Sequence, residues 1–345
     1  MTPGKFMSGS PRSQQGLSIV ELMVAIAISL ILLTGVVQIF LSSKTSYRLL
    51  EATSRVQENG RFAVGFIGED VRMAGYRGCY RDTPANIEAG INTPTSFNWD
   101  YATGIQGNEW TGAGWTPGLN ALIAGQVVNG TDVLITRGLA DDGVNLTATS
   151  TAAQIFAVDA DNITNGDIMI VSDCSQSSIF QVTGQASAAD VVTLDHASGG
   201  AWVPGNINSN LARVYGTDAQ VGRLVTNVYY IGTGASGSPA LFRQSTQPGG
   251  AMQAQELAED VENMQVLYGE DIDNDGVANR YVTANNIGNL NNVVSTRISL
   301  LIRSQDNIAS TEQTYAYNGE DVEANDLRVR RIFNTTIKIR NRGEL

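Results

Sequence analysis

The apolar residues nearest the N-terminus form one long uninterrupted run. Leu17 to Leu41 comprises 25 residues that are almost wholly apolar. As a helix this run would be about 37 Å long, at roughly 1.5 Å per residue, and a bilayer core needs about 20 such residues. Because Lys5 and Arg12 precede the run, the N-terminus is expected to stay cytoplasmic and the remainder to be exported. The run is longer than the apolar region of an ordinary secretory signal, and no A-x-A cleavage site follows it.

Beyond residue 41 the hydrophobic pattern becomes amphipathic. Apolar or small residues recur at spacings of three and four, at Leu49, Ala52, Val56, Gly60, Ala63, Ile67, Val71 and Ala74. This is one face of an α-helix, and no proline occurs between Pro11 and Pro84. The pattern predicts one helix with an apolar half over residues 17–41 and an amphipathic continuation over residues 42–78. Gly60, Gly65 and Gly68 each weaken it by up to about 1 kcal/mol relative to Ala, so a bend or a close helix–sheet approach is expected there.

From residue 79 to residue 345 the pattern predicts a β-rich domain, so the fold class is α+β. Residues 80–130 show no clear period and contain three tryptophans. Strands are predicted at Asp132–Thr136, Gln154–Val158, Asp167–Val171, Ile179–Val182, Val191–Leu194, Leu211–Tyr215, Leu224–Ile231, Ala240–Arg243, Val293–Arg303 and Arg328–Arg340. Gly, Asn and Asp separate most of them, as expected of antiparallel strands joined by tight turns. A short helix is predicted at Gln253–Met264.

Composition excludes several classes of function. The 345 residues carry 22 basic and 34 acidic side chains, a net charge of −12, which argues against a nucleic-acid-binding surface. The acids concentrate in the middle: residues 82–326 hold 7 basic and 28 acidic residues, hence 7 − 28 = −21. His196 is the sole histidine, so a multi-histidine metal site is excluded. The sequence has no phosphate-binding P-loop and no C-x-x-C motif, and no catalytic residue is assigned.

One charged residue interrupts the apolar run, and its surroundings are informative. A carboxylate within a membrane segment costs several kcal/mol, so Glu21 either lies near the membrane boundary or has a partner. The string Gly16-Leu17-Ser18-Ile19-Val20-Glu21-Leu22-Met23 resembles the leader of type IV prepilins and type II secretion pseudopilins. The resemblance implies that a prepilin peptidase cuts after Gly16, removes residues 1–16 and methylates Leu17. In place of Leu17 the family most often has Phe.

The same resemblance implies a role for Glu21. Cleavage would create an ammonium group at Leu17, which one subunit could present to Glu21 of its neighbour. A pair of opposite charges is much less costly in hydrocarbon than two isolated ones, so docking would be favoured in a single axial register. A translation start at Met1 and one at Met7 are both compatible with this leader, since either keeps Arg12 ahead of the cut.

Four further strings narrow the family. Residues 71–79 resemble the end of the spine helix in the PilW type of minor pilin. Residues 263–269, 292–295 and 330–333 are similar to the C-terminal part of the PilW pattern. The resemblance covers both ends of the chain and leaves roughly residues 85–250 without a template.

An Asp-rich segment near the C-terminus has the spacing of a calcium loop. Asp271, Asp273 and Asp275 alternate and are followed by Gly276, and such spacing wraps oxygen ligands around Ca²⁺. The carbonyl of Val277 and the side chain of Asn279 would add two ligands, and Glu270 or a nearby acid would complete the sphere. The twelfth position is Val282 instead of Glu, and strands flank the loop, so an Asp-rich hairpin turn is the alternative. No other cofactor is expected.

Three remaining features suggest structure more than chemistry. Residues 232–237 match G-x-G-x-x-G, but a β-type run follows them instead of a helix, which indicates a hairpin loop. Asp195, His196 and Ser198 are interpreted as a surface loop. The exported cysteines, Cys79 and Cys174, are expected to pair within the chain in an oxidising compartment, with free thiols or bonds to another subunit as alternatives. An intramolecular bond would contribute about 4 kcal/mol in the chain-entropy model.

The combined resemblance implies a structural minor pilin that primes assembly of a type IV pilus and is incorporated at or near its tip, serving adhesion and twitching motility. Its implied partners are the prepilin peptidase, other minor pilins, the major pilin and a tip adhesin. Before assembly the chain would lie in the inner membrane with its C-terminal domain in the periplasm, and afterwards in the cell-surface pilus. The alternatives are a J-like pseudopilin at the tip of a type II secretion pseudopilus, and a membrane-anchored adhesin. A periplasmic enzyme is disfavoured by the lone histidine and the three lysines.

Overall fold

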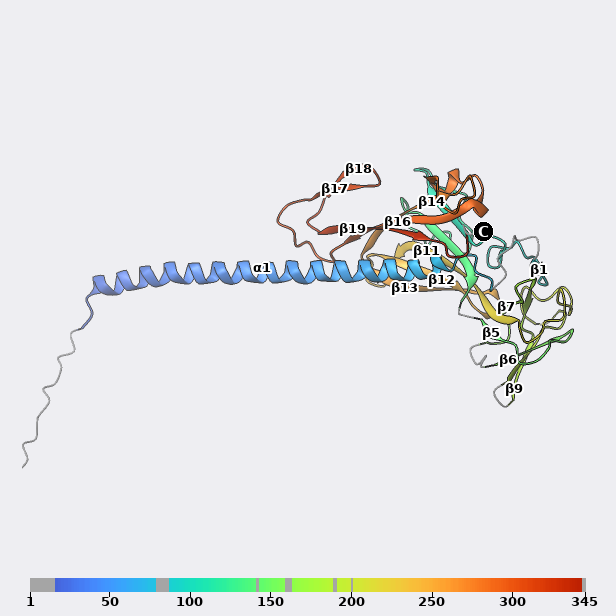
Figure 1. Ribbon diagram of the computed structural model, residues 1–345. Helices are drawn as coiled ribbons and strands as arrows, with labels where there is room; N and C mark the ends of the chain where they lie inside the picture. The colour runs from blue at the N-terminus through green and yellow to red at the C-terminus, as the bar shows by residue number, and fades with distance from the viewer. Residues whose placement is uncertain are drawn as a thin grey trace, which may run out of the picture. The chain divides into compact units, whose positions relative to one another are not determined.

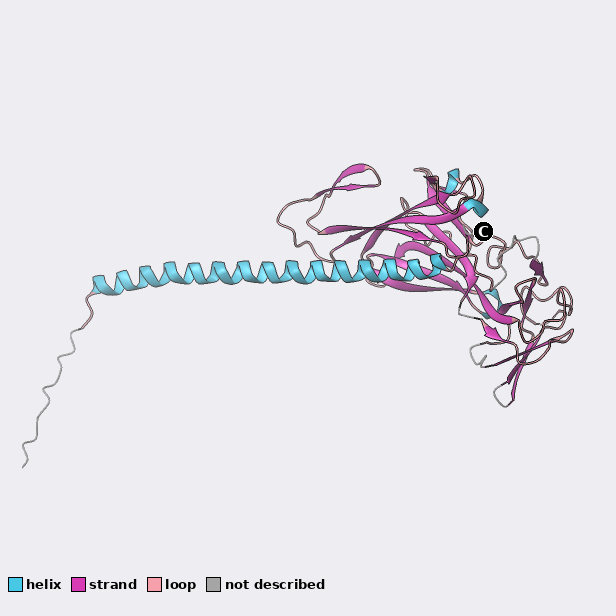
Figure 2. Cartoon of the chain, in the orientation of Figure 1, coloured by secondary structure: helices cyan, strands magenta, loops and turns pink. Residues whose placement is uncertain are grey.

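One long helix and nineteen strands make up most of the part of the chain that the structure, a computed structural model, describes. The described residues are 16–78, 87–140, 143–158, 163–188, 191–199 and 201–342. Contacts divide the chain into two units, residues 1–51 and residues 52–345. Figure 2 shows the helix and the strands by type, and Figure 1 labels them along the chain.

The helix α1 (Ile19–Arg72) is a single element of 54 residues. Ser18 caps its N-terminus: the Ser18 hydroxyl accepts a hydrogen bond from the Glu21 N–H at 3.1 Å, which satisfies one of the unpaired first-turn donors. The helix ends at Arg72 and not at residue 78, because Gly75 takes a left-handed φ of 74° and turns the chain away. The continuous helix across both predicted segments is confirmed.

The amphipathic half of α1 packs into the β domain through a face of small residues. Val56, Ala63, Ile67 and Val71 are buried there, as their spacing predicts. A Cβ atom added to Gly60 would lie within 3.0 Å of three ring carbons of Phe333, so the glycine permits a close approach. The expected close helix–sheet approach is therefore confirmed at Gly60.

The larger sheet has the strand order β1-β8-β7-β11-β4-β2-β3. Off this path, β12 and β5 pair with β11, and β13 pairs with β12. Its strands are β1 (Ile87–Ala89), β2 (Ile105–Trp110), β3 (Trp115–Thr116), β4 (Val133–Leu139), β5 (Val144–Asn145), β7 (Ile168–Ser172), β8 (Ser177–Gln181), β11 (Gln220–Thr233), β12 (Pro239–Thr246) and β13 (Met252–Glu259). All its pairs are antiparallel except β1 with β8. The long strand β11 joins the two ends of the sheet, since it pairs with β7 through its first residues and with β12 through its last.

A second sheet, in the order β15-β14-β16-β19, is wholly antiparallel. Its strands are β14 (Val261–Glu270), β15 (Arg280–Val282), β16 (Val293–Arg303) and β19 (Arg330–Lys338). Side chains from α1, β11, β14, β16 and β19 share one buried apolar cluster that includes Ile67, Tyr229, Met264, Ile298 and Ile337. The amphipathic half of α1 is thus part of the main core of the domain.

Smaller elements complete the domain. A three-stranded sheet contains β6 (Gln154–Val158), β9 (Gly184–Ala188) and β10 (Val191–Asp195), and β17 (Thr314–Tyr317) pairs only with β18 (Glu320–Glu323). In the described part of the chain, 3₁₀ turns lie at Pro248–Gly250, Ala284–Asn286 and Leu290–Asn292. The three-stranded sheet helps to enclose a second apolar cluster around Phe180 and Leu194.

Three local predictions are wrong. The segment Gln253–Met264 is not a helix: β13 and β14 run through it, and Asp260, at a left-handed φ of 59°, separates them. Residues 211–215 form no strand, because Tyr215 is anchored in a loop by hydrogen bonds to Ser178 and Ser150. Within residues 80–130, the strands β1, β2 and β3 occupy part of the segment expected to be irregular.

Candidate functional site

The predicted processing site lies just ahead of the helix. Gly16 and Leu17 are exposed and non-helical, and no atom lies within 4 Å of a Cβ built on Gly16. α1 starts two residues after Leu17, behind the Ser18 cap. The peptide bond between Gly16 and Leu17 is therefore on exposed, non-helical backbone.

Glu21 lies in the first turn of α1, where a carboxylate is favourable because the helix N-terminus carries a partial positive charge. It is the only charged residue between Leu17 and Leu41. All side chains of that segment are exposed, including Leu22, Ile26 and Leu30. By length and composition, α1 can cross a membrane. The structure therefore places a single acidic group at the start of an uncovered apolar helix.

Three carboxylates of the predicted calcium loop come together between β14 and β15. Oxygen atoms of Asp271, Asp273 and Asp275 all lie within 4.8 Å of one another. Asp271 is buried, and its carboxylate accepts hydrogen bonds from the N–H groups of Asp275 at 3.2 Å and Gly276 at 2.8 Å. Although burial opposes ionisation, these N–H donors lower the pKa of Asp271. The loop thus keeps three carboxylates close together, and the carboxylate of Asp271 is held in its ionised form.

Three other residues were suggested as ligands in that loop, and they differ in whether they already have hydrogen-bond partners. Asn279 uses its side-chain oxygen to accept from the Ile272 N–H at 2.6 Å, which closes the loop across its base, and Val277 has an exposed side chain. Glu270 does not complete a coordination sphere, because its carboxylate pairs with Arg280 at 2.8 Å and also accepts from the Gly288 N–H at 2.7 Å. The carboxylate of Glu270 is therefore already engaged, and completion of the sphere by Glu270 or a nearby acid stays a prediction.

One of the two cysteines lies in the part of the chain that the structure describes. Cys174 is disulfide-bonded and sits at a left-handed φ of 66° in the turn between β7 and β8. Cys79, the chain's other cysteine, lies outside the described residues. The pairing of Cys79 with Cys174 stays a prediction.

Two sequence motifs have structural roles. The G-x-G-x-x-G string forms the β11–β12 hairpin, in which Thr233 pairs with Pro239, as expected. His196 is not on a surface loop: only 1% of it is exposed, and its ring packs against Phe180 with centroids 5.1 Å apart. The expectation fails because the backbone N–H of His196 bonds to the Ala153 carbonyl, which draws the residue inward. Burial lowers the pKa of His196.

The sequence did not reveal a pair of carboxylates, one buried and one half-buried, where the two sheets meet. Asp132 accepts hydrogen bonds from the N–H of Trp110 in β2 at 3.1 Å and from the N–H of Val266 in β14 at 2.9 Å. Glu109 lies beside it, with one carboxylate oxygen buried and without a hydrogen-bond partner among the described residues. Burial, together with the neighbouring acid, raises the pKa of Glu109, and burial raises that of Asp132. No local pattern signals the pair, because Glu109 lies in β2 and Asp132 lies 23 residues later, just before β4.

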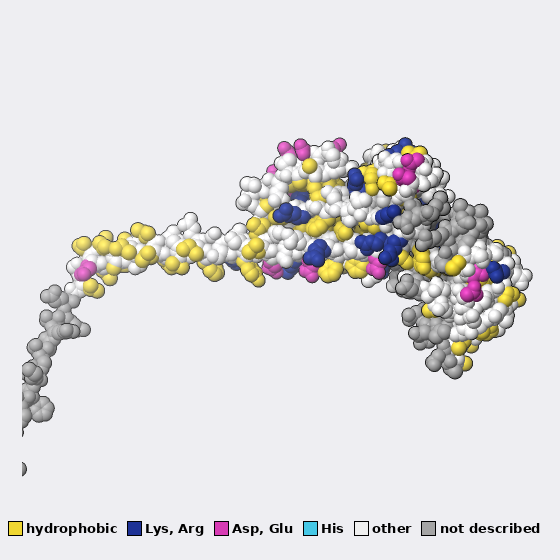
Figure 3. Space-filling view, viewed as in Figure 1, with side chains coloured by type: hydrophobic (Ala, Val, Ile, Leu, Met, Phe, Trp, Pro, Cys, Tyr) yellow, Lys and Arg dark blue, Asp and Glu magenta, His cyan; other side chains and the backbone are white. Residues whose placement is uncertain are grey.

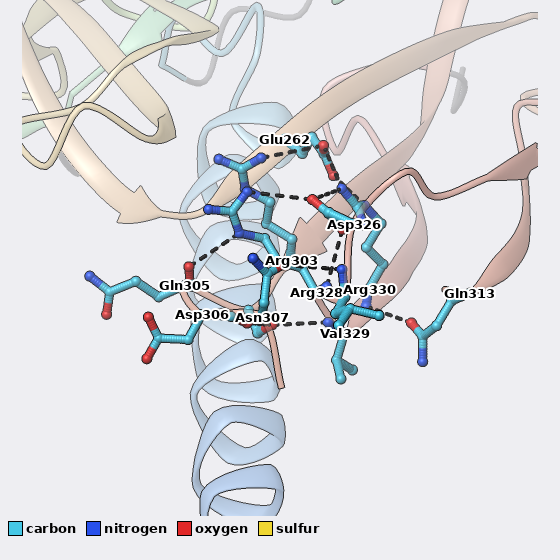
Figure 4. A network of polar contacts seen from close by, with 12 residues as sticks. Glu262, Arg303, Gln305, Asp306, Asn307, Gln313, Asp326, Arg328, Val329 and Arg330 are labelled. Atoms are coloured by element: carbon cyan, nitrogen blue, oxygen red, sulfur yellow. Dashed lines mark hydrogen bonds and ion pairs between the residues drawn. The ribbon is translucent and has the colours of Figure 1, made fainter. Parts of the chain in front are cut away.

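A charged network anchors the segment between β16 and β19 (Figure 4). Arg330, whose side chain is 4% exposed, lies between Glu262 and Asp326, at 2.7 Å and 2.6 Å. Arg303 approaches Glu262 at 3.6 Å, and Arg328 approaches Asp326 at 3.4 Å. Hydrogen bonds from Arg330 lower the pKa of Asp326 to about 2. The network fixes both ends of the segment that carries the β17–β18 hairpin.

Comparison with known proteins gives two family matches. Residues 228–341 match the model of type IV pilus-assembly protein W, PilW, and residues 11–37 match the prokaryotic N-terminal methylation motif. No curated protein and no solved structure matches the chain. The PilW match runs from the middle of β11 to the end of β19, and thus contains the sheet that packs on α1. The methylation motif contains the exposed Gly16–Leu17 bond and Glu21.

Proposed function

We propose that the chain is a PilW-type minor pilin of a type IV pilus, which primes pilus assembly and sits at or near the tip. The PilW match over residues 228–341 and the methylation motif over residues 11–37 support this proposal. One observation carries the proposal: a single acidic residue, Glu21, stands at the start of an exposed apolar helix that leads directly into the core of a PilW-type domain. The proposed role is structural.

The apolar half of α1 would serve first as a membrane anchor and then as part of the filament core. In both settings its exposed side chains leave water, at about 25 cal/mol per Å² of apolar surface buried. A bilayer and a bundle of like helices satisfy this requirement equally well, so apolar burial alone does not draw the chain out of the membrane.

Charge pairing supplies the preference that apolar burial lacks. Cleavage after Gly16 would leave an ammonium group at Leu17, four residues before Glu21. Glu21 of one subunit and the ammonium of its neighbour would compensate each other in a low-dielectric setting, where an unpaired charge costs several kcal/mol. Only one axial offset between two helices brings these groups together, so the pair would set the register of docking.

The partners proposed for this step are the prepilin peptidase, the other minor pilins and the major pilin, with a tip adhesin bound to the β domain. The chain would begin in the inner membrane with its β domain in the periplasm. A J-like pseudopilin of a type II secretion system would share the leader and the helix. Copurification with sheared pili, compared with a secretion assay in the same deletion strain, separates the two functions.

Mass spectrometry of the N-terminus tests the proposal. In cells with the prepilin peptidase, the mature chain is expected to begin at N-methylated Leu17. Without the peptidase, or with Gly16→Val, the leader is expected to remain. Gly35→Ala serves as the matched control, because a Cβ at Gly35 meets no atom within 4 Å and the variant is expected to be processed normally. A cut at another position, or an unprocessed chain in wild-type cells, refutes the proposal.

A further inference from the structure

Strand β19 forms one edge of the C-terminal sheet. The sheet has the order β15-β14-β16-β19, and β19 pairs with β16 along all nine of its residues. Among the described residues, no strand pairs with its other edge. An edge strand of this length presents a row of backbone N–H and C=O groups that can template a further strand.

Exposed positively charged side chains occur on β19, just after it, and on the half of α1 that packs in the same domain. Figure 3 shows Lys and Arg side chains gathered along the part of α1 that belongs to the β domain and just beside it. Five such residues are exposed, and none forms an ion pair with a described acidic residue: Arg61, Arg72, Arg331, Lys338 and Arg340. Two exposed acids, Glu58 and Glu69, lie on the same half of the helix, which leaves an excess of positive charge.

Helix α1 runs beside β19 and forms a second wall. The N–H of Arg340 donates to the carbonyl of Arg72 at 3.0 Å, and the Ile337 side chain reaches the helix at Gly68. Gly65, one turn before Gly68, is exposed and has no atom within 4 Å of its Cβ position. The exposed surface of this half of the helix carries glycine, arginine and phenylalanine residues. At the start of β19 the Arg330 N–H donates to the Gln313 side chain at 3.1 Å, and no described strand pairs with the rest of that edge.

The polar character of β19 bears on what could occupy the edge. Natural sheets protect open edges with charged residues. Arg331 and Lys338, near the two ends of β19, would repel an added strand that carries basic side chains. Between them, Asn334, Thr335 and Thr336 leave the centre of the strand uncharged. A strand carrying acidic side chains would meet basic side chains at both ends of β19, and the excess of positive charge on the neighbouring helix outweighs Glu58 and Glu69.

We propose that the open edge of β19 binds an extended, acidic segment of a partner protein, which adds a fifth strand to the C-terminal sheet. Backbone hydrogen bonds to β19 would provide the general affinity. Acidic side chains meeting Arg331, Lys338 and the exposed arginines of α1 would provide the selectivity. This inference does not rest on the proposed role in the pilus, and it concerns a surface separate from Glu21.

Peptide binding to the full-length protein in detergent tests the inference. The probe is a nine-residue peptide that alternates Thr or Val with Glu, and the control peptide has Lys in place of Glu. We expect the acidic peptide to bind, the basic one not to bind, and the double variant Arg331→Glu/Lys338→Glu to lose about tenfold in affinity. Lys44→Glu, an exposed charge reversal in the first unit, is the matched control and is expected to bind as wild type does.

Two N-methylated versions of the acidic peptide separate strand addition from simple charge attraction. One carries backbone methyl groups at odd positions and the other at even positions. Because alternate N–H groups of a strand point to opposite sides, strand addition predicts that one set abolishes binding while the other leaves it nearly intact. Equal binding of both sets overturns the proposal.

The chain itself contains an acidic strand, β18, so a second copy is the competing occupant. Analytical ultracentrifugation of the full-length protein, with and without Glu320→Lys/Glu323→Lys, addresses it. Self-association that these substitutions abolish would assign the edge to a second copy and overturn the partner proposal. Absence of such self-association, together with peptide binding, supports it.

Discussion

The contact between Gly60 and Phe333 provides the sharpest test of how α1 is seated in the β domain. A Cβ atom at position 60 would lie within 3.0 Å of three ring carbons, whereas carbon atoms in contact need about 3.5 Å. The ring of Phe333 would have to withdraw by roughly 1 Å from a packed core, or the helix would have to lift. Gly65, on the same helix, meets nothing within 4 Å, which makes it the matched control.

The two alanine substitutions are expected to have opposite signs. At Gly65, replacing a helical glycine by alanine gains about 1 kcal/mol of stability from helix propensity alone. At Gly60 the same gain is opposed by overpacking, which costs typically 1–3 kcal/mol and more for a rigid ring. The clash exceeds the gain, so Gly60→Ala should lower the free energy of unfolding by about 1 kcal/mol, a difference of about 2 kcal/mol from Gly65→Ala.

Removing the ring should reverse the effect at Gly60. In a Phe333→Ala background, Gly60→Ala should stabilise the protein by about 1 kcal/mol, because the propensity gain is then unopposed. Thermal unfolding of the full-length protein in detergent, followed by circular dichroism, measures all four variants and the cycle between them. If Gly60→Ala stabilises the wild type as much as Gly65→Ala does, the close seating of α1 against β19 is refuted.

Three further predictions concern charged groups of the β domain. Burial raises the pKa of Glu109 and of Asp132, so the folded state binds more protons than the unfolded chain. The free energy of unfolding should therefore fall as the pH rises from about 4 toward neutral. Glu109→Gln should make this fall smaller, as measured by thermal unfolding at several pH values. If the 271–279 loop binds Ca²⁺, saturating calcium should raise the melting temperature of the wild type but not that of Asp273→Asn. Asp321→Asn, which changes an exposed acid elsewhere, is the control and should respond as the wild type does. An equal rise in melting temperature for all three proteins would rule out calcium binding by the loop. Arg330→Met should cost about 2–3 kcal/mol in denaturant unfolding, since it removes the nearest partner of two partly buried carboxylates, which keep only the longer contacts with Arg303 and Arg328. A loss under about 1 kcal/mol would show that the network is not important for stability.

Periodicity predicted the helix and most strands because both signals are local. The spacing of Val56, Ala63, Ile67 and Val71 fixed the buried face of α1, and those residues are in the core. Similarly, β6 and β16 have the predicted bounds. The segment 253–264 failed because its apolar spacing fits a helix, whereas the pairing of β13 with β12 and of β14 with β16 decides its structure. The partners of β14 in β16 lie more than twenty residues along the chain and leave no trace in a local window.

Candidate sites could likewise be predicted where their residues are close in sequence, and could not where they are far apart. The three aspartates of the 271–279 loop could be predicted because their spacing in sequence is their spacing in space. The Glu109–Asp132 pair could not, because it depends on how β2, β4 and β14 meet. His196 was misplaced for a related reason: a polar residue at a strand end usually faces water, but here a backbone hydrogen bond to Ala153 turns it toward Phe180.

The Ser18 cap makes it possible to separate two roles of Glu21. A carboxylate three residues after a capping serine suits a capping box, which stabilises a helix start without any partner subunit, and Gln can replace Glu in that box. Charge pairing with a neighbouring ammonium, in contrast, requires the carboxylate. If Glu21 acts by pairing, most of the Glu21→Gln protein should be missing from sheared pili, since the variant keeps the capping capacity and loses the charge. Ser18→Ala should assemble normally, because it loses about 1 kcal/mol of capping and keeps the charge. Immunoblots of the pilus fraction, normalised to processed protein in the membrane, measure both variants. Wild-type incorporation of Glu21→Gln would show that Glu21 serves the helix start and not the docking of subunits.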